Sequence, residues 1–310
     1  MKKKMLVAVI AMLISLSVTM TALAATPIYE NGFDGTLGGA QTLTRKGDNE
    51  NGGNAGTMPE VDTSVKAQFQ EGKNSQALYL DGTYGVLLDA EPAGSSYTIA
   101  FWINPAGFSN YGPLVQIGSD LLSQNASAKW LNITKTDWDG DMAPVMWSRN
   151  ETTAAWPWFS GGPGYLMPSN EWTHIAVTVD ASTPGLEANT VLGKLYINGE
   201  YLSEGNVATE VFEGDAKIYL GINCWDINMK GLIDDFKVYN TVLNEEEIKE
   251  AMNTPASTSA SSTTSSEGSA KSTSTEATPK TGAVSYALVY GLVALGAGAG
   301  AVVLRKKEDK

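Results

Sequence analysis

The clearest strand signal in the chain is the run Tyr97-Thr98-Ile99-Ala100-Phe101-Trp102-Ile103, in which every residue is aromatic, β-branched or apolar. Such residues favour the pleated, partly buried environment of a strand. Outward from this run, similar short stretches recur, separated by Gly, Asn, Asp and Pro. They predict ten strands, at residues 77–80, 84–88, 97–103, 114–117, 129–134, 144–149, 173–179, 192–197, 217–221 and 232–239. Ten strands with almost no helix predict an all-β fold, either a sandwich or a barrel.

Local signals add one hairpin and one helix to these strands. Asn198-Gly199 follows an apolar run and is typical of a tight β-hairpin turn. Asn244 can cap a helix at residues 245–252, with Glu247 reaching back from the third position as in a capping box. This helix is expected to end a single domain at residues 25–252. Residues 253–278 are mostly Ser, Thr and Ala and predict a flexible stalk, because they cannot bury enough apolar surface to fold.

The first 24 residues have the three regions of a secretory signal peptide. Three lysines occupy positions 2–4, an apolar run follows, and Ala22-Leu23-Ala24 provides a small-residue cleavage site. We therefore expect export and removal of residues 1–24.

The last 32 residues, 279–310, combine three features in a fixed order. Pro279-Lys280-Thr281-Gly282 precedes an uncharged run at 283–304, and Arg305-Lys306-Lys307 follows it at once. The run is long enough to form a transmembrane helix with its basic tail on the cytoplasmic side.

The order of these three features resembles the sorting signal of Gram-positive sortase substrates, although Thr278 stands where Leu is usual. The resemblance implies cleavage between Thr281 and Gly282 by a sortase, followed by attachment to peptidoglycan in the cell wall. The alternative is an uncut single-span membrane anchor.

Charge and rare residues exclude several function classes. The chain has a net charge of −13, which disfavours nucleic acid and anionic membranes. Cys224 is the only cysteine, so no internal disulfide can form. His174 is the only histidine, which removes multi-histidine metal sites and argues against most histidine-based catalysis.

Several linked segments carry a family resemblance. They are Gln76-Ala77-Leu78-Tyr79-Leu80-Asp81-Gly82, Thr98 to Ile103, Glu171-Trp172-Thr173-His174-Ile175-Ala176-Val177-Thr178, Lys194 to Gly199 and Gly231-Leu232-Ile233-Asp234-Asp235-Phe236-Lys237-Val238-Tyr239. In this order they resemble the LamG-like jelly-roll branch of the concanavalin A-like sandwiches. The resemblance implies two antiparallel sheets, with ligands bound on a concave face or at the loop rim. It leaves function open, because the fold hosts lectins, adhesins, calcium-dependent binders and glycosidases.

Four tryptophans stand in loop-like surroundings and are candidates for ligand binding. Sugar recognition combines flat aromatic faces with a few hydrogen-bonding side chains. The candidate ligand-binding residues are Trp138, Trp156, Trp158 and Trp225, with Arg149, Asn223 and Asp226 as polar partners. The alternative is that these tryptophans are lids sealing the edge of the sandwich. Trp102 and Trp172 are predicted to be core residues, and His174 a structural, hydrogen-bonded one.

Two acidic regions are candidate metal or catalytic sites. The resemblance implies a structural Ca²⁺ held by Asp34, near the start, and Asp235, in the last strand, and oxygen ligands suit this ion. An ordinary turn at Asp34-Gly35 is the alternative. The second region is Asp137-Trp138-Asp139-Gly140-Asp141. A turn is the preferred interpretation of this segment. A calcium loop is the second alternative, and the catalytic carboxylates of a glycosidase are the third.

These observations predict a non-catalytic, wall-anchored carbohydrate-binding or adhesion module. Its expected partners are a glycan or another host or bacterial surface ligand, a sortase, and peptidoglycan. A protein-binding structural adhesin is the alternative, and a glycoside hydrolase ranks third.

Overall fold

A computed structural model describes residues 25–45, 59–107, 112–119, 129–135, 144–153, 156–162, 165 and 167–258. All of them belong to one compact unit, residues 1–263. The expected signal peptide, the sorting signal and the greater part of the expected stalk lie outside the described residues, as does the 137–141 segment. No helix within the described ranges has the length and hydropathy of a membrane span.

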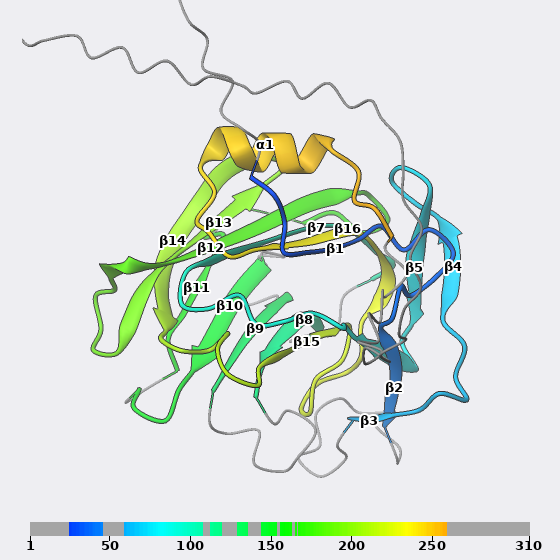
Figure 1. Ribbon diagram of the computed structural model, residues 1–310, viewed down its shortest axis with the longest axis horizontal. Coiled ribbons are helices and arrows are strands. Elements are labelled where there is room, and N and C mark those ends of the chain that lie inside the picture. Colours follow the sequence, from blue (N-terminus) through cyan, green and yellow to red (C-terminus); the bar gives the residue numbers. More distant parts are fainter. Residues whose placement is uncertain are drawn as a thin grey trace, which may run out of the picture. The chain divides into compact units, whose positions relative to one another are not determined.

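The described chain forms two antiparallel sheets and one helix (Figure 1). The first sheet has the strand order β14-β13-β12-β7-β16-β5-β4, with β1 paired to β16. Its strands are β1 (Tyr29–Asn31), β4 (Gln68–Glu71), β5 (Gln76–Asp81), β7 (Tyr97–Pro105), β12 (Thr173–Pro184), β13 (Thr190–Ile197), β14 (Glu200–Ala208) and β16 (Lys230–Tyr239). We call it sheet A.

The second sheet, sheet B, has the order β11-β10-β9-β8-β15-β6-β2-β3. Its strands are β2 (Gln41–Arg45), β3 (Pro59–Val61), β6 (Tyr84–Leu87), β8 (Pro113–Gly118), β9 (Trp130–Lys135), β10 (Pro144–Arg149), β11 (Trp158–Ser160) and β15 (Lys217–Leu220). The two sheets form separate layers in Figure 1, with sheet A nearer the helix. This confirms the predicted all-β sandwich.

The hydrophobic core lies between the two sheets and follows from the alternation of side chains along each strand. Ile99, Phe101 and Ile175 contribute from sheet A, while Leu131 and Ile133 contribute from sheet B, and all are fully buried. Because successive strand residues point to opposite faces, the residues between them must lie on the outer faces of the sandwich. The core thus fixes which side chains each outer face presents.

All ten predicted strands are present, and six more were missed. The missed strands, β1, β2, β3, β4, β11 and β14, are short or largely half-exposed, so their apolar content is low. Trp158 was assigned to a loop because of nearby Pro and Gly, and this was wrong. It begins strand β11, which pairs with β10 and places Phe159 in the core.

The predicted hairpin and helix are both confirmed. Asn198 and Gly199 have φ angles of 51° and 83° and join β13 to β14, as a tight hairpin turn requires. Helix α1 (Glu245–Asn253) begins with the predicted capping box between Asn244 and Glu247. The described chain includes residues 253–258, and Asp235 and Asp34 bind this segment by accepting from Ala256 N and Thr258 Oγ1.

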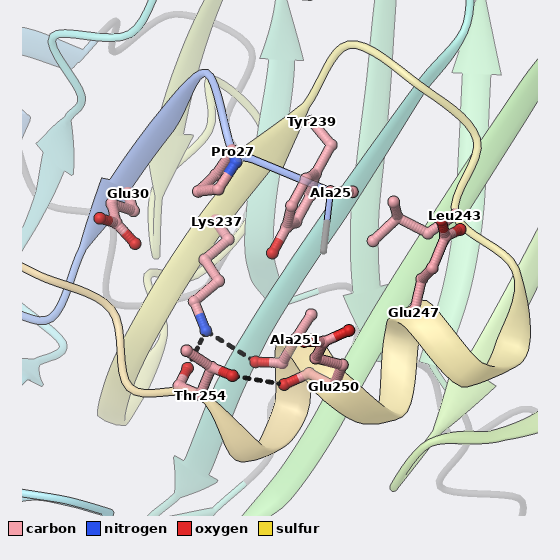
Figure 2. Close-up of a pocket in the computed structure, with 10 residues that line it drawn as sticks. All are labelled: Ala25, Pro27, Glu30, Lys237, Tyr239, Leu243, Glu247, Glu250, Ala251 and Thr254. Carbon is pink, nitrogen blue, oxygen red and sulfur yellow. Dashed lines mark hydrogen bonds between the residues drawn. The ribbon is translucent and has the colours of Figure 1, made fainter. Parts of the chain in front are cut away.

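Lys237 of β16 points toward the carboxyl end of α1, near Ala251 and Thr254 (Figure 2). It is buried, and its Nζ donates to the carbonyl oxygens of Ala251, at 2.6 Å, and of Thr254. The last carbonyls of a helix have no partner within the helix, so this lysine satisfies groups that would otherwise remain buried and unpaired. Burial lowers the pKa of Lys237, an effect opposed by the carboxylates of Asp235 and Glu30.

Substitution Lys237→Met is expected to lower the free energy of unfolding by about 1–2 kcal/mol, because two helix-end carbonyls lose their buried donor. Urea unfolding followed by circular dichroism measures this change. Lys230→Met is a matched control, since Lys230 is exposed on the same strand, β16. Equal stability of Lys237→Met and the wild-type chain would contradict the assigned role.

Candidate functional site

The central part of the outer face of sheet A is covered by a helix. Helix α1 packs on it through Ile248 and Ala251, which meet Ala100, Ala176 and Tyr239 from the sheet. Figure 1 shows the helix lying across this layer. A ligand the size of an oligosaccharide therefore has no open sheet surface beneath the helix.

Two predicted structural residues also lie on this covered face. Trp102 and His174 are cross-strand neighbours with ring centroids 5.2 Å apart, and Trp102 Nε1 donates to Met252 O at 3.2 Å. Burial and the nearby Lys237 charge lower the pKa of His174 to about 3, so its ring is neutral. His174 Nδ1 has no hydrogen-bond partner among the described residues, so the hydrogen bond expected for this ring is missing there. Trp102 is buried but outside the inter-sheet core, and Trp172 is only half-buried.

The outer face of sheet B carries a different set of side chains. Leu131 and Ile133 of β9 point into the core, so Asn132 between them points outward. From β11 to β2, the outward residues that face one another in register are Trp158, Trp147, Asn132, Gln116, Tyr219, Leu87 and Gln41. Side chains directly opposite in adjacent strands lie within contact distance. This row, which we call the outer row, crosses almost the whole sheet.

Tryptophans gather at one end of the outer row. Trp147 and Trp158 stack with ring centroids 5.9 Å apart and planes inclined by 22°. Trp156 lies 6.4 Å from Trp147 and 6.1 Å from Trp130, which is 5.2 Å from Trp225. Trp156 and Trp158 remain 55% and 48% exposed. The five rings form one cluster with a large aromatic surface open to solvent.

Polar amides occupy the centre of the same row. Gln116 and Asn132 are 1% and 5% exposed, and they are direct cross-strand neighbours on β8 and β9. Gln116 Nε2, Gln116 Oε1 and Asn132 Oδ1 have no hydrogen-bond partner in the described part of the chain. Most buried polar groups in folded proteins are hydrogen-bonded, so unpaired ones require a specific explanation.

Arg45 anchors the loop that carries Trp225. Its Nη2 donates to the carbonyl oxygens of Asn223 and of Asp226, the latter at 2.6 Å. Asn223 in turn accepts from the backbone N–H of Trp225 at 2.9 Å and donates to the Asp226 carboxylate at 2.7 Å. Burial raises the pKa of Asp226, while the Asn223 hydrogen bond and the Arg45 charge oppose this rise. The network fixes Trp225 against Trp130.

The lone cysteine lies beside this network and is structural in character. Cys224 is buried among Leu43, Tyr219 and Ile222. Burial raises the pKa of its thiol to about 12, so the reactive thiolate is not formed at neutral pH.

The predicted metal residues lie where both ends of the described chain meet. Ala256 O, Asp34 Oδ2 and Thr258 Oγ1 lie 2.5, 3.1 and 3.3 Å from the point where a Cβ on Gly32 would stand. Asp235 holds the same segment, accepting from Ala256 N at 2.7 Å. The three atoms nearest to this point are oxygens, and oxygen atoms are the ligands that Ca²⁺ prefers. These oxygens are of the type that could contact Ca²⁺, and Asp34 would then be a carboxylate ligand. Within the described ranges, no group of three or more His, Cys, Asp or Glu side chains could hold a metal.

Comparison with known proteins assigns the family. A match to the concanavalin A-like lectin/glucanases superfamily covers residues 72–249, more than half of the chain. The chain belongs to this superfamily. No curated protein matches the sequence.

Solved structures show the same sandwich at low sequence identity. Domain 4 of a GH43 extracellular arabinanase from Geobacillus stearothermophilus, in complex with arabinotriose, is 23% identical, with a TM-score of 0.53 over 74% of this chain and 99% of that one. The binding domain of Paraclostridial Mosquitocidal Protein 1 is 15% identical, with a TM-score of 0.45 over 70% and 53%. The CBM40 of a Ruminococcus gnavus IT-sialidase, bound to α2,3-sialyllactose, is 16% identical, with a TM-score of 0.42 over 60% and 98%.

This superfamily member brings several predicted site residues together. Trp156, Trp158 and Trp225 join one cluster, and Arg149 faces Trp130 in register on the same outer face. Asn223 and Asp226 lie nearby and hydrogen-bond to each other and to Arg45, and these bonds hold the loop that carries Trp225. Trp138 lies outside the described residues. So do Thr281 and Gly282.

Four residues of the superfamily member's outer face were missed by sequence reasoning. They are Gln116, Trp130, Asn132 and Trp147. A signal for them was present, because polar residues alternate with core residues in Leu131-Asn132-Ile133-Thr134 and in Val115-Gln116-Ile117. That alternation places Asn132 and Gln116 on a face away from the core.

Proposed function

We propose that this chain is a non-catalytic carbohydrate-binding module that holds its ligand on the outer face of sheet B. One observation supports this most strongly. The same sheet face carries exposed tryptophan rings and, next to them, buried amide groups that have no hydrogen-bond partner among the described residues. On sheet A, helix α1 covers the central part of the outer face.

The side chains match the chemistry of a sugar. An indole ring offers a flat apolar face to the C–H groups of a sugar ring, and its burial contributes to affinity. Amide side chains then fix orientation by hydrogen bonding to hydroxyl groups. Trp156 and Trp158 would supply the flat surface, with Gln116 and Asn132 as the polar partners.

The acidic chain favours an uncharged ligand. Its net charge of −13 creates a field that repels anions approaching from solution. The arabinanase domain was solved in complex with arabinotriose, a neutral sugar, and this supports testing arabinan fragments first.

An array of plant, mucin and cell-wall glycans, probed with the purified chain, tests the proposal. Binding to a defined neutral glycan, without turnover of that glycan, is the expected result. Silence across the array would contradict it. Capture of a partner protein that survives removal of the partner's glycans would point to protein adhesion instead.

We also propose that the module is displayed outside the cell and attached to peptidoglycan through Thr281. Support comes from the order of the terminal motifs in the sequence. Blotting of wall and membrane fractions after muramidase digestion tests this, with the product expected in the wall fraction. Recovery entirely in the detergent-soluble membrane would indicate an uncut anchor.

A third proposal concerns Ca²⁺ as a structural ligand at the cradle beside Gly32, with Asp34 in direct contact and Asp235 holding the adjoining segment. The ion would tie the start of the sandwich to the chain that follows α1. Its support is the convergence of oxygen atoms from Asp34, Ala256 and Thr258.

A further inference from the structure

We infer that Gln116 and Asn132 select the class of ligand, a neutral sugar that presents adjacent hydroxyl groups to the centre of sheet B. This inference rests on the proposed carbohydrate-binding function and goes further by assigning the residues that determine specificity. The two residues stand out because the outer row contains buried amide atoms that have no hydrogen-bond partner among the described residues.

The two amides are placed side by side by the sheet itself. Gln116 on β8 and Asn132 on β9 are register partners, so their Cβ atoms are about 5 Å apart. Trp147 is the next partner beyond Asn132, and Tyr219 the next beyond Gln116. The amides are therefore bounded on both sides by aromatic rings, as the floor of a sugar site would be.

The unpartnered atoms determine which hydrogen-bond donors and acceptors a ligand must supply. Gln116 Nε2 is a donor, while Gln116 Oε1 and Asn132 Oδ1 are acceptors, and all three are buried without a partner among the described residues. Satisfying them requires at least one acceptor and two donor hydrogens. A hydroxyl group supplies one donor and one acceptor, so two hydroxyl groups satisfy the set, whereas a carboxylate supplies acceptors alone.

The outer row is uncharged, which is consistent with a ligand that binds through hydroxyl groups. No outer-row residue, from Trp158 to Gln41, carries a charge at neutral pH. Arg149 faces Trp130 in register and not the amides. A carboxylate placed over the two amides would leave their oxygens without donors.

The decisive test substitutes Gln116→Leu in the full chain, a change that keeps most of the side-chain volume. Because the amide is unsatisfied without ligand, its removal is expected to raise the Tm by roughly 2–8 °C. The same variant should bind neutral arabinan, xylan, galactan or glucan fragments at least about tenfold more weakly. Gln70→Leu is the control, since Gln70 is an exposed glutamine on β4 of sheet A and should alter neither property.

The outcomes separate this inference from the proposed function. Retained binding by Gln116→Leu, or a lower Tm, would overturn the inference alone and make the amide a structural group. Wild-type binding restricted to oligogalacturonates would overturn the ligand class. No binding by the wild-type chain to any of these fragments, neutral or acidic, would overturn both.

Discussion

Replacing Trp158 with alanine is expected to weaken glycan binding by about 30-fold or more, the cost of removing a central aromatic anchor from an interface. Trp158 is nearly half exposed and stacks on Trp147, so its ring is positioned by the sheet but still faces solvent. The Tm should change little, because little of its surface is buried in the core. Trp156→Ala should behave in the same way. Isothermal titration calorimetry with the oligosaccharide found on the array measures the loss.

Tyr201→Ala is the matched control for both tryptophan variants. Tyr201 is an aromatic residue of similar exposure, 47%, but it lies on β14 of sheet A. It should leave affinity unchanged. If Tyr201→Ala weakened binding as much as Trp158→Ala, the ligand could not be confined to sheet B.

Removing calcium is expected to lower the Tm of the chain. An ion that binds only the folded state stabilises it by about 2.7 kcal/mol when free calcium is a hundredfold above its dissociation constant. For a domain of this size that corresponds to roughly 5–10 °C. Asp34→Asn should remove most of the calcium-dependent shift, because Asp34 Oδ2 lines the cradle beside Gly32. Thermal melts with calcium and with chelator measure the shift.

Two further variants sharpen the calcium test. Asp235→Asn should reduce the response as well, since Asp235 holds the segment that supplies Ala256 O. Asp215→Asn is the control, because Asp215 is exposed in the turn that precedes β15. Identical wild-type melting temperatures in both buffers would reject the site. A full response by Asp34→Asn would move it elsewhere.

The fold could be predicted from sequence because its central strands bury one or both faces. Runs such as 97–103 and 173–179 must be apolar to sit between other strands and the opposite sheet. The missed strands bury few side chains and depend largely on pairing with their neighbours. β1, for example, is held by backbone pairing to the distant strand β16, which no local pattern reveals.

The candidate site was predictable only in part. Trp156, Trp158 and Trp225 stood out because turn-forming residues surround them, but Trp130 and Trp147 looked like ordinary strand residues. Their outward orientation depends on register across four strands. Asn223 and Asp226 were predicted as polar partners because they share a loop with Trp225, and their bonds to Arg45 span 178 and 181 residues of sequence. Such distant pairing follows from the fold and cannot be read from spacing.

The most direct test of ligand binding on sheet B uses the indole N–H signals of the eight tryptophans, observed by NMR in chain labelled with ¹⁵N-tryptophan. The array-selected oligosaccharide is added stepwise. The signals of Trp156, Trp158, Trp147 and Trp130 should shift together with one dissociation constant. The Trp102 signal should stay unchanged, because its Nε1 is bonded to Met252 O beneath α1 on the opposite face. A shift of Trp102 with the sheet B signals unchanged would contradict carbohydrate binding on sheet B.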